Sequence, residues 1–508
     1  MDVSLVGQER LPAAPLVQPC RPTVPTRVDG SARGAATAMA APLTPVPLRR
    51  QRPVTPSRGR APLAERRRAV GGGAGTRRVG GQGPSRRPSS TSGGRDRGRG
   101  GAYDAPVPLE PLSPSAGDRF AAAVAGFLES AHLVAPDALP SLISTTARAL
   151  GATAASVWLA DHQQRFLVRV PGRAGDERHP IEGTMAGRAF ISSEVVEASH
   201  ESDRGPMWVP LLDGVDRIGV LELEVPATTD EVAGRFRHLA SIAAAELIAR
   251  GQYSDIYTIT RRQRAMSLAA EMQWQVLPPN SFAVRDLSVA AMLEPAYDVG
   301  GDAFDYAYQD GVLQFAIFDA VGHGLESSLM STLTVGTYRH RRRSGDELDR
   351  TARAIDTMIA DQFGDARYAT GQLGRVDVSS GRLTLVNAGH PPPLLIRNER
   401  VVGPLTCPPR LPFGLGHLAK EPPGPMFDEQ LEPGDALLLY TDGVVEARRS
   451  RGSDFGLERL EHFLHRALAS GLPVAEMLRR LSHEVLDYYG GQLQDDASML
   501  LVRWHPAR

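Results

Sequence analysis

The chain has 508 residues, enough for two or three domains that each bury a core of their own. Its formal net charge of −1 hides an asymmetry, because arginines crowd into the first hundred residues and leave the remainder acidic. The two cysteines, Cys20 and Cys407, exclude a disulfide framework or a cysteine zinc site and fit a reducing cytoplasm. No apolar run approaches the ~20 residues that span a bilayer, and no signal peptide is visible, so we expect a cytoplasmic protein without a membrane segment.

Residues 1–112 are rich in proline, glycine, serine and arginine. Such a composition cannot bury enough apolar surface to offset chain entropy, so we predict a disordered tail. Its arginine density raises the possibility of nucleic-acid binding. However, no aromatic residue for base stacking precedes Tyr103, and no folded reader is visible, so a nucleic-acid partner is not expected.

Residues 118–250 have the composition of a folded domain. Apolar residues recur at helical spacing in 120–128 and 139–150, strand-like runs follow, and a helix is predicted over 229–249. Asp213-Gly214 predicts a hairpin turn between two of the strands, which are expected at 155–159, 166–170, 207–212 and 217–225. This order, with the pieces GRAF (187–190) and WVPLLDGVDRIGVLEL (208–223), resembles a GAF sensory domain. The resemblance implies a helix-flanked antiparallel sheet, and it leaves the ligand open between a small molecule, a protein partner and none.

A connector helix is predicted over residues 253–279. Ala265, Ala269, Met272 and Val276 stand at heptad-like spacing, and the helix would end at Pro278-Pro279. Such a helix could carry a homodimer contact or transmit a change between domains. An ordinary helix packed on its neighbours is the alternative.

From about residue 285 to residue 508, strands alternate with helices, and aspartates stand at the strand ends. Two glycines precede the first of these aspartates, and a Gly322-His323-Gly324 turn follows the second, ahead of a helix from about residue 325. The strand-end acids are Asp302 with Asp305 one pleat further, Asp319 after the strand 313–318, Asp442 with Gly443 after 436–441, and Asp495 and Asp496 before 498–504. Carboxylates without a histidine or cysteine cluster favour a hard divalent cation, Mg²⁺ or Mn²⁺. Two such ions would share a water and lower its pKa.

Five pieces carry a family resemblance: GGDAFD, FDAVGHG, LVNAGHPPPLLI, YTDGVVEA and DDASMLLV. In this order and spacing they resemble the PPM (PP2C-type) phosphatases, in their bacterial branch of sporulation stage II E and sigma-B regulator proteins, over about residues 270–505. The resemblance implies an α+β fold, with an αββα antiparallel sandwich for the phosphatase domain. It also implies hydrolysis of a phosphoserine or phosphothreonine by a metal-activated water, without a phosphoenzyme.

The resemblance assigns roles to individual residues. Asp319 would bridge two Mn²⁺ or Mg²⁺ ions, Asp442 and Asp495 would complete the first site, and the carbonyl of Ala320 would reach the second. Asp302 would act near the first ion through water. Residues expected to support the ligands or the turns are Asp305, Asp496, Gly322, His323, Gly324 and Gly443. His323 could instead protonate the leaving oxygen, although a turn role is favoured, and His390 is expected to be structural. No arginine can be assigned from the sequence as the phosphate anchor.

The implied substrate is a phosphorylated anti-sigma-factor antagonist, with the GAF-like domain as the controlling input. Two other functions are compatible with part of the sequence. GGDAF differs by one residue from the hallmark of diguanylate cyclases, but a cyclase does not explain the later TDG and DDAS pieces. A catalytically weak phosphatase fold used as a sensory or binding module is the second alternative, and against it no metal aspartate is missing.

Overall fold

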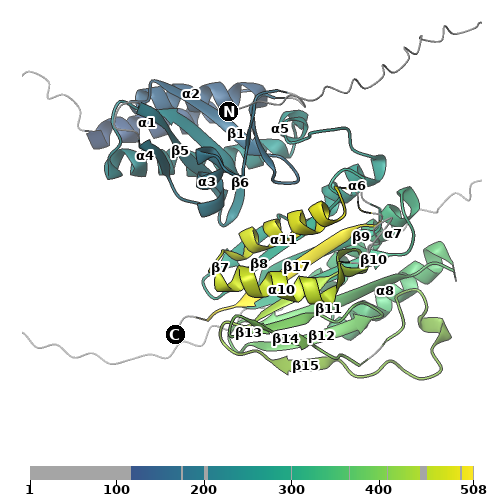
Figure 1. The fold of residues 1–508 in the computed structure, drawn as a ribbon. Coiled ribbons are helices and arrows are strands. Elements are labelled where there is room, and N and C mark those ends of the chain that lie inside the picture. The colour runs from purple at the N-terminus through teal and green to yellow at the C-terminus, as the bar shows by residue number, and fades with distance from the viewer. Residues whose placement is uncertain are drawn as a thin grey trace, which may run out of the picture. The chain divides into compact units, whose positions relative to one another are not determined.

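The computed structural model describes residues 116–172, 176–199, 204–298, 300–364, 366–408, 410–446, 455–491, 493 and 495–506. The expected tail, 1–112, lies outside these residues. Two sets of strands form, one before residue 225 and one after residue 280, with one long and two short helices between them in the sequence (Figure 1). Within the described residues, no helix is both long enough and apolar enough to cross a membrane.

The first set of elements is a six-stranded antiparallel sheet with helices packed against it. The strand order is β3-β2-β1-β6-β5-β4. The strands are β1 (Ala154–Ala160), β2 (Phe166–Arg169), β3 (Arg178–Pro180), β4 (Val196–Ser199), β5 (Arg204–Asp213) and β6 (Asp216–Glu224). The helices are α1 (Ala116–Ala131), α2 (Leu139–Ala149), α3 (Met185–Ser192) and α4 (Asp230–Gly251), with a 3₁₀ turn η1 at Pro136–Ala138. The predicted helix-flanked antiparallel sheet is therefore present, and its assignment as a GAF domain stays a prediction.

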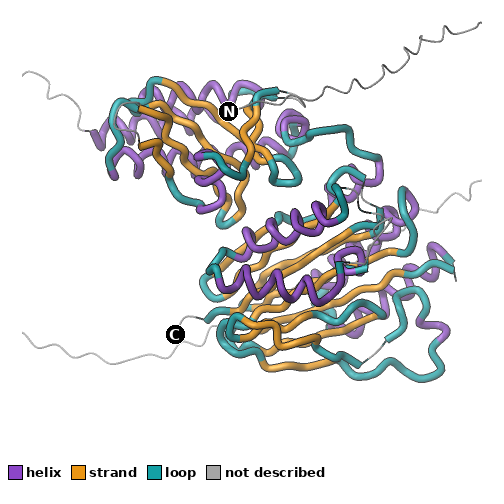
Figure 2. The backbone as a smooth tube through the Cα atoms, in the orientation of Figure 1, coloured by secondary structure: helices purple, strands orange, loops and turns teal. Residues whose placement is uncertain are grey.

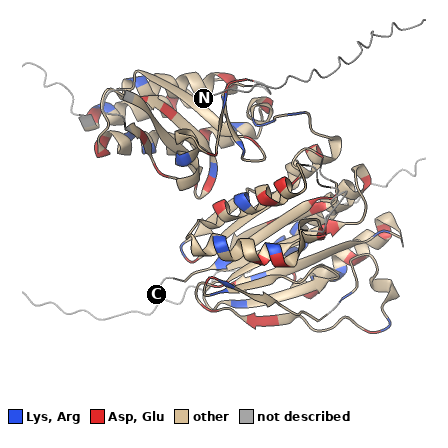
Figure 3. Cartoon of the chain, viewed as in Figure 1, with Lys and Arg blue, Asp and Glu red and all other residues tan. Residues whose placement is uncertain are grey.

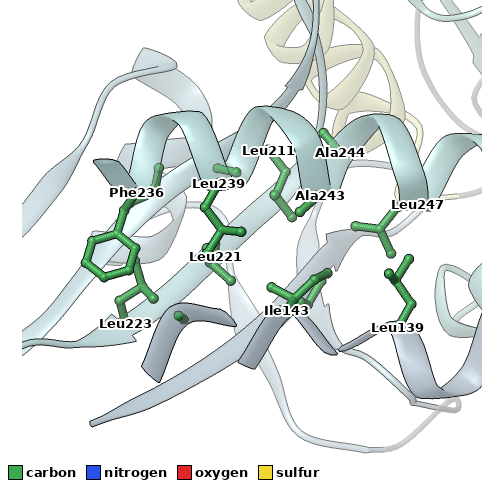
Figure 4. Close-up of a cluster of buried hydrophobic side chains, with 14 of the residues drawn as sticks. Leu139, Ile143, Leu211, Leu221, Leu223, Phe236, Leu239, Ala243, Ala244 and Leu247 are labelled. Carbon is green, nitrogen blue, oxygen red and sulfur yellow. The ribbon is translucent and has the colours of Figure 1, made fainter. Parts of the chain in front are cut away.

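Local sequence explains the two best-predicted features of this domain. Asp213 pairs with Asp216, and Gly214 has a φ of +59°, so the hairpin turn lies where Asp213-Gly214 predicted it. The hydroxyl of Thr229 accepts a hydrogen bond from Val232 N and begins α4. Figure 4 shows the apolar face of this helix, including Phe236 and Leu239, packed onto strand and α2 side chains.

The connector is not one helix, and this prediction was wrong. It consists of α5 (Asp255–Thr260) and α6 (Leu268–Val276), separated by seven residues that are not helical. The break follows from local capping, because the Ser267 hydroxyl accepts from Ala270 N and starts a new helix. Ala265 therefore lies outside both helices, so the heptad-like spacing does not run along one helical face.

The second set of elements contains two antiparallel sheets. One has five strands in the order β15-β12-β11-β10-β9, and the other has six in the order β14-β13-β16-β17-β8-β7. The strands are β7 (Ser281–Val284), β8 (Leu287–Glu294), β9 (Asp302–Gln309), β10 (Val312–Ala320), β11 (Ala369–Asp377), β12 (Arg382–Ala388), β13 (Leu394–Arg397), β14 (Arg400–Pro404), β15 (Phe427–Gln430), β16 (Ala436–Tyr440) and β17 (Ala497–Trp504). Because β7 belongs to the second sheet, this domain begins before the expected residue 285.

The sheets form the two inner layers of a four-layer sandwich, and their strands are drawn in orange in Figure 2. Along β10, Phe315 and Ile317 enter the core between the sheets, while Ala316 and Phe318 face helices on the other side. This period of two is what a strand buried on both faces requires. The predicted αββα arrangement is confirmed.

The helices make the two outer layers. α7 (Leu325–Arg343) and α8 (Leu348–Phe363) cover the five-stranded sheet, and α10 (Gly456–Ala469) and α11 (Val474–Tyr488) cover the six-stranded one. Figure 1 shows α10 and α11 side by side, and Figure 3 shows both acidic and basic residues along them. Shorter elements are α9 (Asp442–Val445) and η2 (Gly416–Leu418).

Candidate active site

Two of the predicted aspartates belong to the five-stranded sheet. Asp302 begins β9 and lies directly opposite Asp319, near the end of β10. Asp302 is buried, and its pKa is raised well above the usual value by burial and then by the charges of Asp319 and Asp496. Burial and the charges of Asp442 and Asp495 raise the pKa of Asp319 to about 7. The largest effects on both acids therefore come from burial and from other carboxylates.

The other predicted acids belong to the six-stranded sheet. Asp442 follows β16 as the first residue of α9, and burial, with the charge of Asp495 second, raises its pKa. Asp495 is exposed and precedes β17, whereas Asp496 is buried. A β-carbon on Gly443 would lie 1.8 Å from the Asp496 carbonyl oxygen, so only glycine lets these two segments meet.

Hydrogen bonds join the acids of one sheet to those of the other. The Asp496 Oδ2 atom accepts from Gly300 N and Gly301 N, each at 2.6 Å, which fixes the loop before Asp302. The Thr441 hydroxyl donates to Asp302 Oδ2 at 2.7 Å and accepts from Ser498 N at 2.9 Å. Asp496 therefore supports the loop before Asp302, and its predicted role behind the metal ligands stays a prediction. Thr441 was missed, although it stands beside Asp442 in the YTDG piece.

Asp305 is held by two arginines rather than left free. Its buried carboxylate forms ion pairs with Arg339 and Arg342 of α7, each at 2.7 Å. These pairs tie α7 to β9, so Asp305 supports the fold behind the site. Neither arginine was predicted, and their spacing of three on one helical face is the signal that could have identified them.

The turn after Asp319 has the predicted form. Gly322 and Gly324 have φ values of +95° and +82°, in the left-handed region that favours glycine, and the exposed His323 stands between them. Ser327 and Ser328, in the first turn of α7, both donate hydrogen bonds to the Gly300 carbonyl, at 2.9 and 2.6 Å. The glycine loops before Asp302 and after Asp319 are therefore held together by the start of α7.

An arginine that sequence reasoning did not assign lies beside this turn. Nη1 of Arg367 is 3.8 Å from the position that a β-carbon on Gly322 would occupy, and Nη2 forms an ion pair with Glu326 at 2.7 Å. Both side chains are partly exposed, with 39% of Arg367 and 58% of Glu326 accessible. The Val321 N–H donates to the Tyr368 carbonyl, and this bond holds the segment that contains Arg367 next to the turn after Asp319.

The strand-end acids provide an all-oxygen donor set. In the described part of the chain, no three histidine, cysteine, aspartate or glutamate side chains are gathered into a metal-binding cluster. Asp302, Asp319 and Asp442 nevertheless share raised pKa values, which come from burial and mutual repulsion. A divalent cation would relieve that repulsion, so the chemistry of the residues fits hard-metal binding.

Comparison with known proteins agrees with the motifs. Residues 309–505 match the family model described as stage II sporulation protein E. The chain is 26% identical over 268 residues to Protein IcfG of Synechocystis sp., a match that covers 46% of this chain and 40% of IcfG. It is 22% identical over 241 residues to phosphoserine phosphatase RsbU of Bacillus subtilis, covering 47% of this chain and 69% of RsbU. The chain thus spans less than half of the length of IcfG.

Among solved structures, the RsbU and RsbW domains of Rv1364c from Mycobacterium tuberculosis match with 28% identity. That match covers 44% of this chain and 63% of the other, with a TM-score of 0.37. The SiaA-PP2C domain of Pseudomonas aeruginosa matches with 21% identity over 46% of this chain and 94% of the other, with a TM-score of 0.39. Residues 309–505 are thus similar to the stage II sporulation protein E family, and the wider match includes a relative named phosphoserine phosphatase.

Proposed function

We propose that the chain is a metal-dependent protein serine/threonine phosphatase. The observation that carries this proposal is the meeting of acids from two sheets, Asp302 and Asp319 from one and Asp442 and Asp495 from the other. Burial and neighbouring carboxylates raise the pKa values of Asp302, Asp319 and Asp442. Such repulsion between buried carboxylates is costly unless a cation is part of the working state. The match to a phosphatase family gives that cation a role in catalysis.

The proposed ligands follow the family pattern. Asp319 would hold both of two Mn²⁺ or Mg²⁺ ions, Asp442 and Asp495 the first, and the Ala320 carbonyl the second, with Asp302 acting through water. When bound, the ions supply positive charge that lowers the pKa of water and neutralises the oxygens of the phosphate. Asp496 and Thr441 keep the loop and side chain of Asp302 in place through the hydrogen bonds described above.

Arg367 is the residue that we assign to phosphate binding. Its guanidinium lies against the Gly322 turn and, among the described residues, forms its ion pair with Glu326, which is more than half exposed. A phosphate entering beside Asp319 can replace that carboxylate as the partner, because guanidinium and phosphate match in charge and in hydrogen-bond geometry. The arginine would then hold the phosphoryl group in one orientation beside the strand-end acids.

The proposed substrate is a phosphoserine or phosphothreonine on a regulatory protein, an anti-sigma-factor antagonist. The support is the relationship to a protein named phosphoserine phosphatase RsbU, together with the family of the domain. The GAF-like domain would control the rate, and the chain would work in the cytoplasm. If so, removing residues 1–250 changes the basal rate or its response to a ligand, whereas an unchanged rate and response would remove this part of the proposal.

The deciding experiment is hydrolysis of a generic phosphate ester and of a phosphoserine protein by the full chain. Rates are compared with Mn²⁺, with Mg²⁺ and with a chelator, for the wild type, Asp319→Ala and Asp442→Ala. Asp428→Ala is the matched control, because this aspartate lies on β15 and pairs with Arg382 at an exposed position. We expect turnover that needs metal and is lost in both site variants but not in the control. No turnover with any metal or substrate would favour a binding or sensory module with a phosphatase fold.

A further inference from the structure

His390 lies in the loop between β12 and β13, which connects one sheet of the sandwich to the other. Its side chain is buried, with 5% exposed. Its backbone N–H donates to Asn387 Oδ1, and Asn387 Nδ2 donates to the His390 carbonyl, both at 2.9 Å. The Gln372 amide also donates to the Pro391 carbonyl at 2.6 Å. The loop therefore fixes the imidazole ring in one place.

The ring is directed at Thr370. Nδ1 of His390 lies 2.8 Å from Thr370 Oγ1. Thr370 in turn stands opposite Asp319 in the pairing of β11 with β10, and its hydroxyl opposes the rise in the pKa of the Asp319 carboxyl. One threonine hydroxyl thus lies between a buried imidazole and the carboxylate at the centre of the site.

The proton count distinguishes two arrangements of this chain of contacts. A hydroxyl has a single proton, so a threonine that donates to Asp319 can only accept from His390. In that arrangement the ring carries its proton on Nδ1, and Nε2 has none to give to the nearby Tyr440 backbone carbonyl. The opposite arrangement, in which Thr370 donates to an unprotonated Nδ1, would leave Asp319 without this donor.

We propose that His390 is a positioning residue that, through Thr370, orients the Asp319 carboxylate toward bound divalent metal. This inference rests on the proposed function, because it assigns a support to the acid expected to hold both ions. Partners of this kind fix the direction of a ligand's lone pairs, and their loss typically weakens metal binding by roughly 10- to 100-fold. A histidine that only filled space in the crossing would have no such effect.

The first test measures Mn²⁺ binding to the full chain by calorimetry, without turnover. Thr370→Val keeps the shape of the side chain but removes the hydroxyl, and we expect it to weaken Mn²⁺ binding by roughly 10-fold or more. Thr370→Ser keeps the hydroxyl and should bind nearly as the wild type does. Thr384→Val is the matched control, because Thr384 donates to Asp428 on the neighbouring strands β12 and β15, away from the site. It should leave Mn²⁺ affinity unchanged.

The second test concerns the ring. His390→Leu should weaken Mn²⁺ binding to a similar extent, and His390→Asn, whose amide nitrogen can occupy about the position of Nδ1, should restore most of it. Nitrogen NMR of the histidine-labelled wild type should show the His390 proton on Nδ1. Thermal unfolding in chelator checks that each variant is folded before its affinity is compared.

The outcomes separate this inference from the proposed function. If the wild type binds Mn²⁺ and Thr370→Val and His390→Leu bind it equally well, the relay is wrong and the metal site stands. A ring protonated on Nε2 rather than Nδ1 also overturns the relay. If the wild type binds neither Mn²⁺ nor Mg²⁺, the metal site and the relay fall together.

Discussion

Gly301 lies so close to Ala320 that a β-carbon on residue 301 would stand 2.4 Å from the Ala320 carbonyl oxygen. This is the carbonyl expected to reach the second ion, and Ala320 N also donates to the Gly301 carbonyl at 3.2 Å. A methyl group here cannot be accommodated without moving one backbone segment. The second glycine of the GGDAFD piece is therefore explained by the closeness of two backbones at the site.

Gly301→Ala should consequently separate the two loops. We expect a loss of about 1–3 kcal/mol in the free energy of unfolding, as for overpacking elsewhere, together with weaker Mn²⁺ binding. Urea unfolding in chelator measures the first effect and calorimetry the second. Gly336→Ala is the control, because Gly336 lies inside α7 with open space around it. This variant protein should be more stable than the wild type by up to about 1 kcal/mol. Equal behaviour of the two variants would contradict the steric argument.

Asp319→Asn should change how metal affects stability. Asp319 and Asp302 face each other across β9 and β10, and like charges placed directly opposite destabilise a sheet by about 0.2–1 kcal/mol. In chelator the variant should therefore unfold at the same temperature as the wild type or a slightly higher one. On adding Mn²⁺, the wild type should gain thermal stability and the variant should not. A variant that is clearly less stable in chelator would show that repulsion is not the dominant effect.

Arg367→Ala should affect substrate binding more than the chemical step. If the guanidinium orients the phosphate, its loss raises KM for a phosphoprotein, while Mn²⁺ affinity stays that of the wild type. Glu326→Gln removes the competing carboxylate of the ion pair and should lower KM or leave it unchanged. Steady-state kinetics on a phosphoserine protein at two salt concentrations distinguishes these cases. An unchanged KM in Arg367→Ala would assign phosphate binding elsewhere.

The acid sensitivity of the fold should depend on His390. Burial lowers the pKa of this histidine to about 3, although the nearby Tyr440 backbone carbonyl acts in the opposite direction. The unfolded chain takes up this proton near pH 6.5 and the folded chain only near pH 3, so stability is lost as pH falls through that interval. Between pH 7.5 and pH 5 the loss is about 2 kcal/mol. His390→Asn should remove it, which urea unfolding at both pH values in chelator would measure, and an identical pH slope would refute it.

Patterns within one element were predictable from the sequence. The apolar run before Asp319 predicted β10, and the Gly322-His323-Gly324 turn predicted a helix from Leu325, because each signal is local. The connector failed because apolar spacing says nothing about a capping serine such as Ser267, which restarts the helix. Local signals therefore predicted where a helix or strand forms more reliably than whether a helix continues without a break.

The support around the acids could not be predicted in the same way. Asp496 and Gly301 are 195 positions apart, and Thr441 and Asp302 are 139 apart, yet each pair is hydrogen-bonded. Threonine and arginine are common at strand ends and on helices, so no single-sequence pattern distinguishes Thr441 or Arg367 from other such residues. Their roles depend on how two sheets pack, which only the tertiary structure provides.

The position of β17 has a consequence for biosynthesis. This strand holds the last of the described sheet pairings in sequence, yet it lies between β16 and β8 in the interior of its sheet. A nascent chain on the ribosome therefore cannot close that sheet, or bring Asp495 and Asp496 to the other acids, until residue 504 has left the exit tunnel. Translation products that end before β17 should therefore lack the complete sheet and its activity.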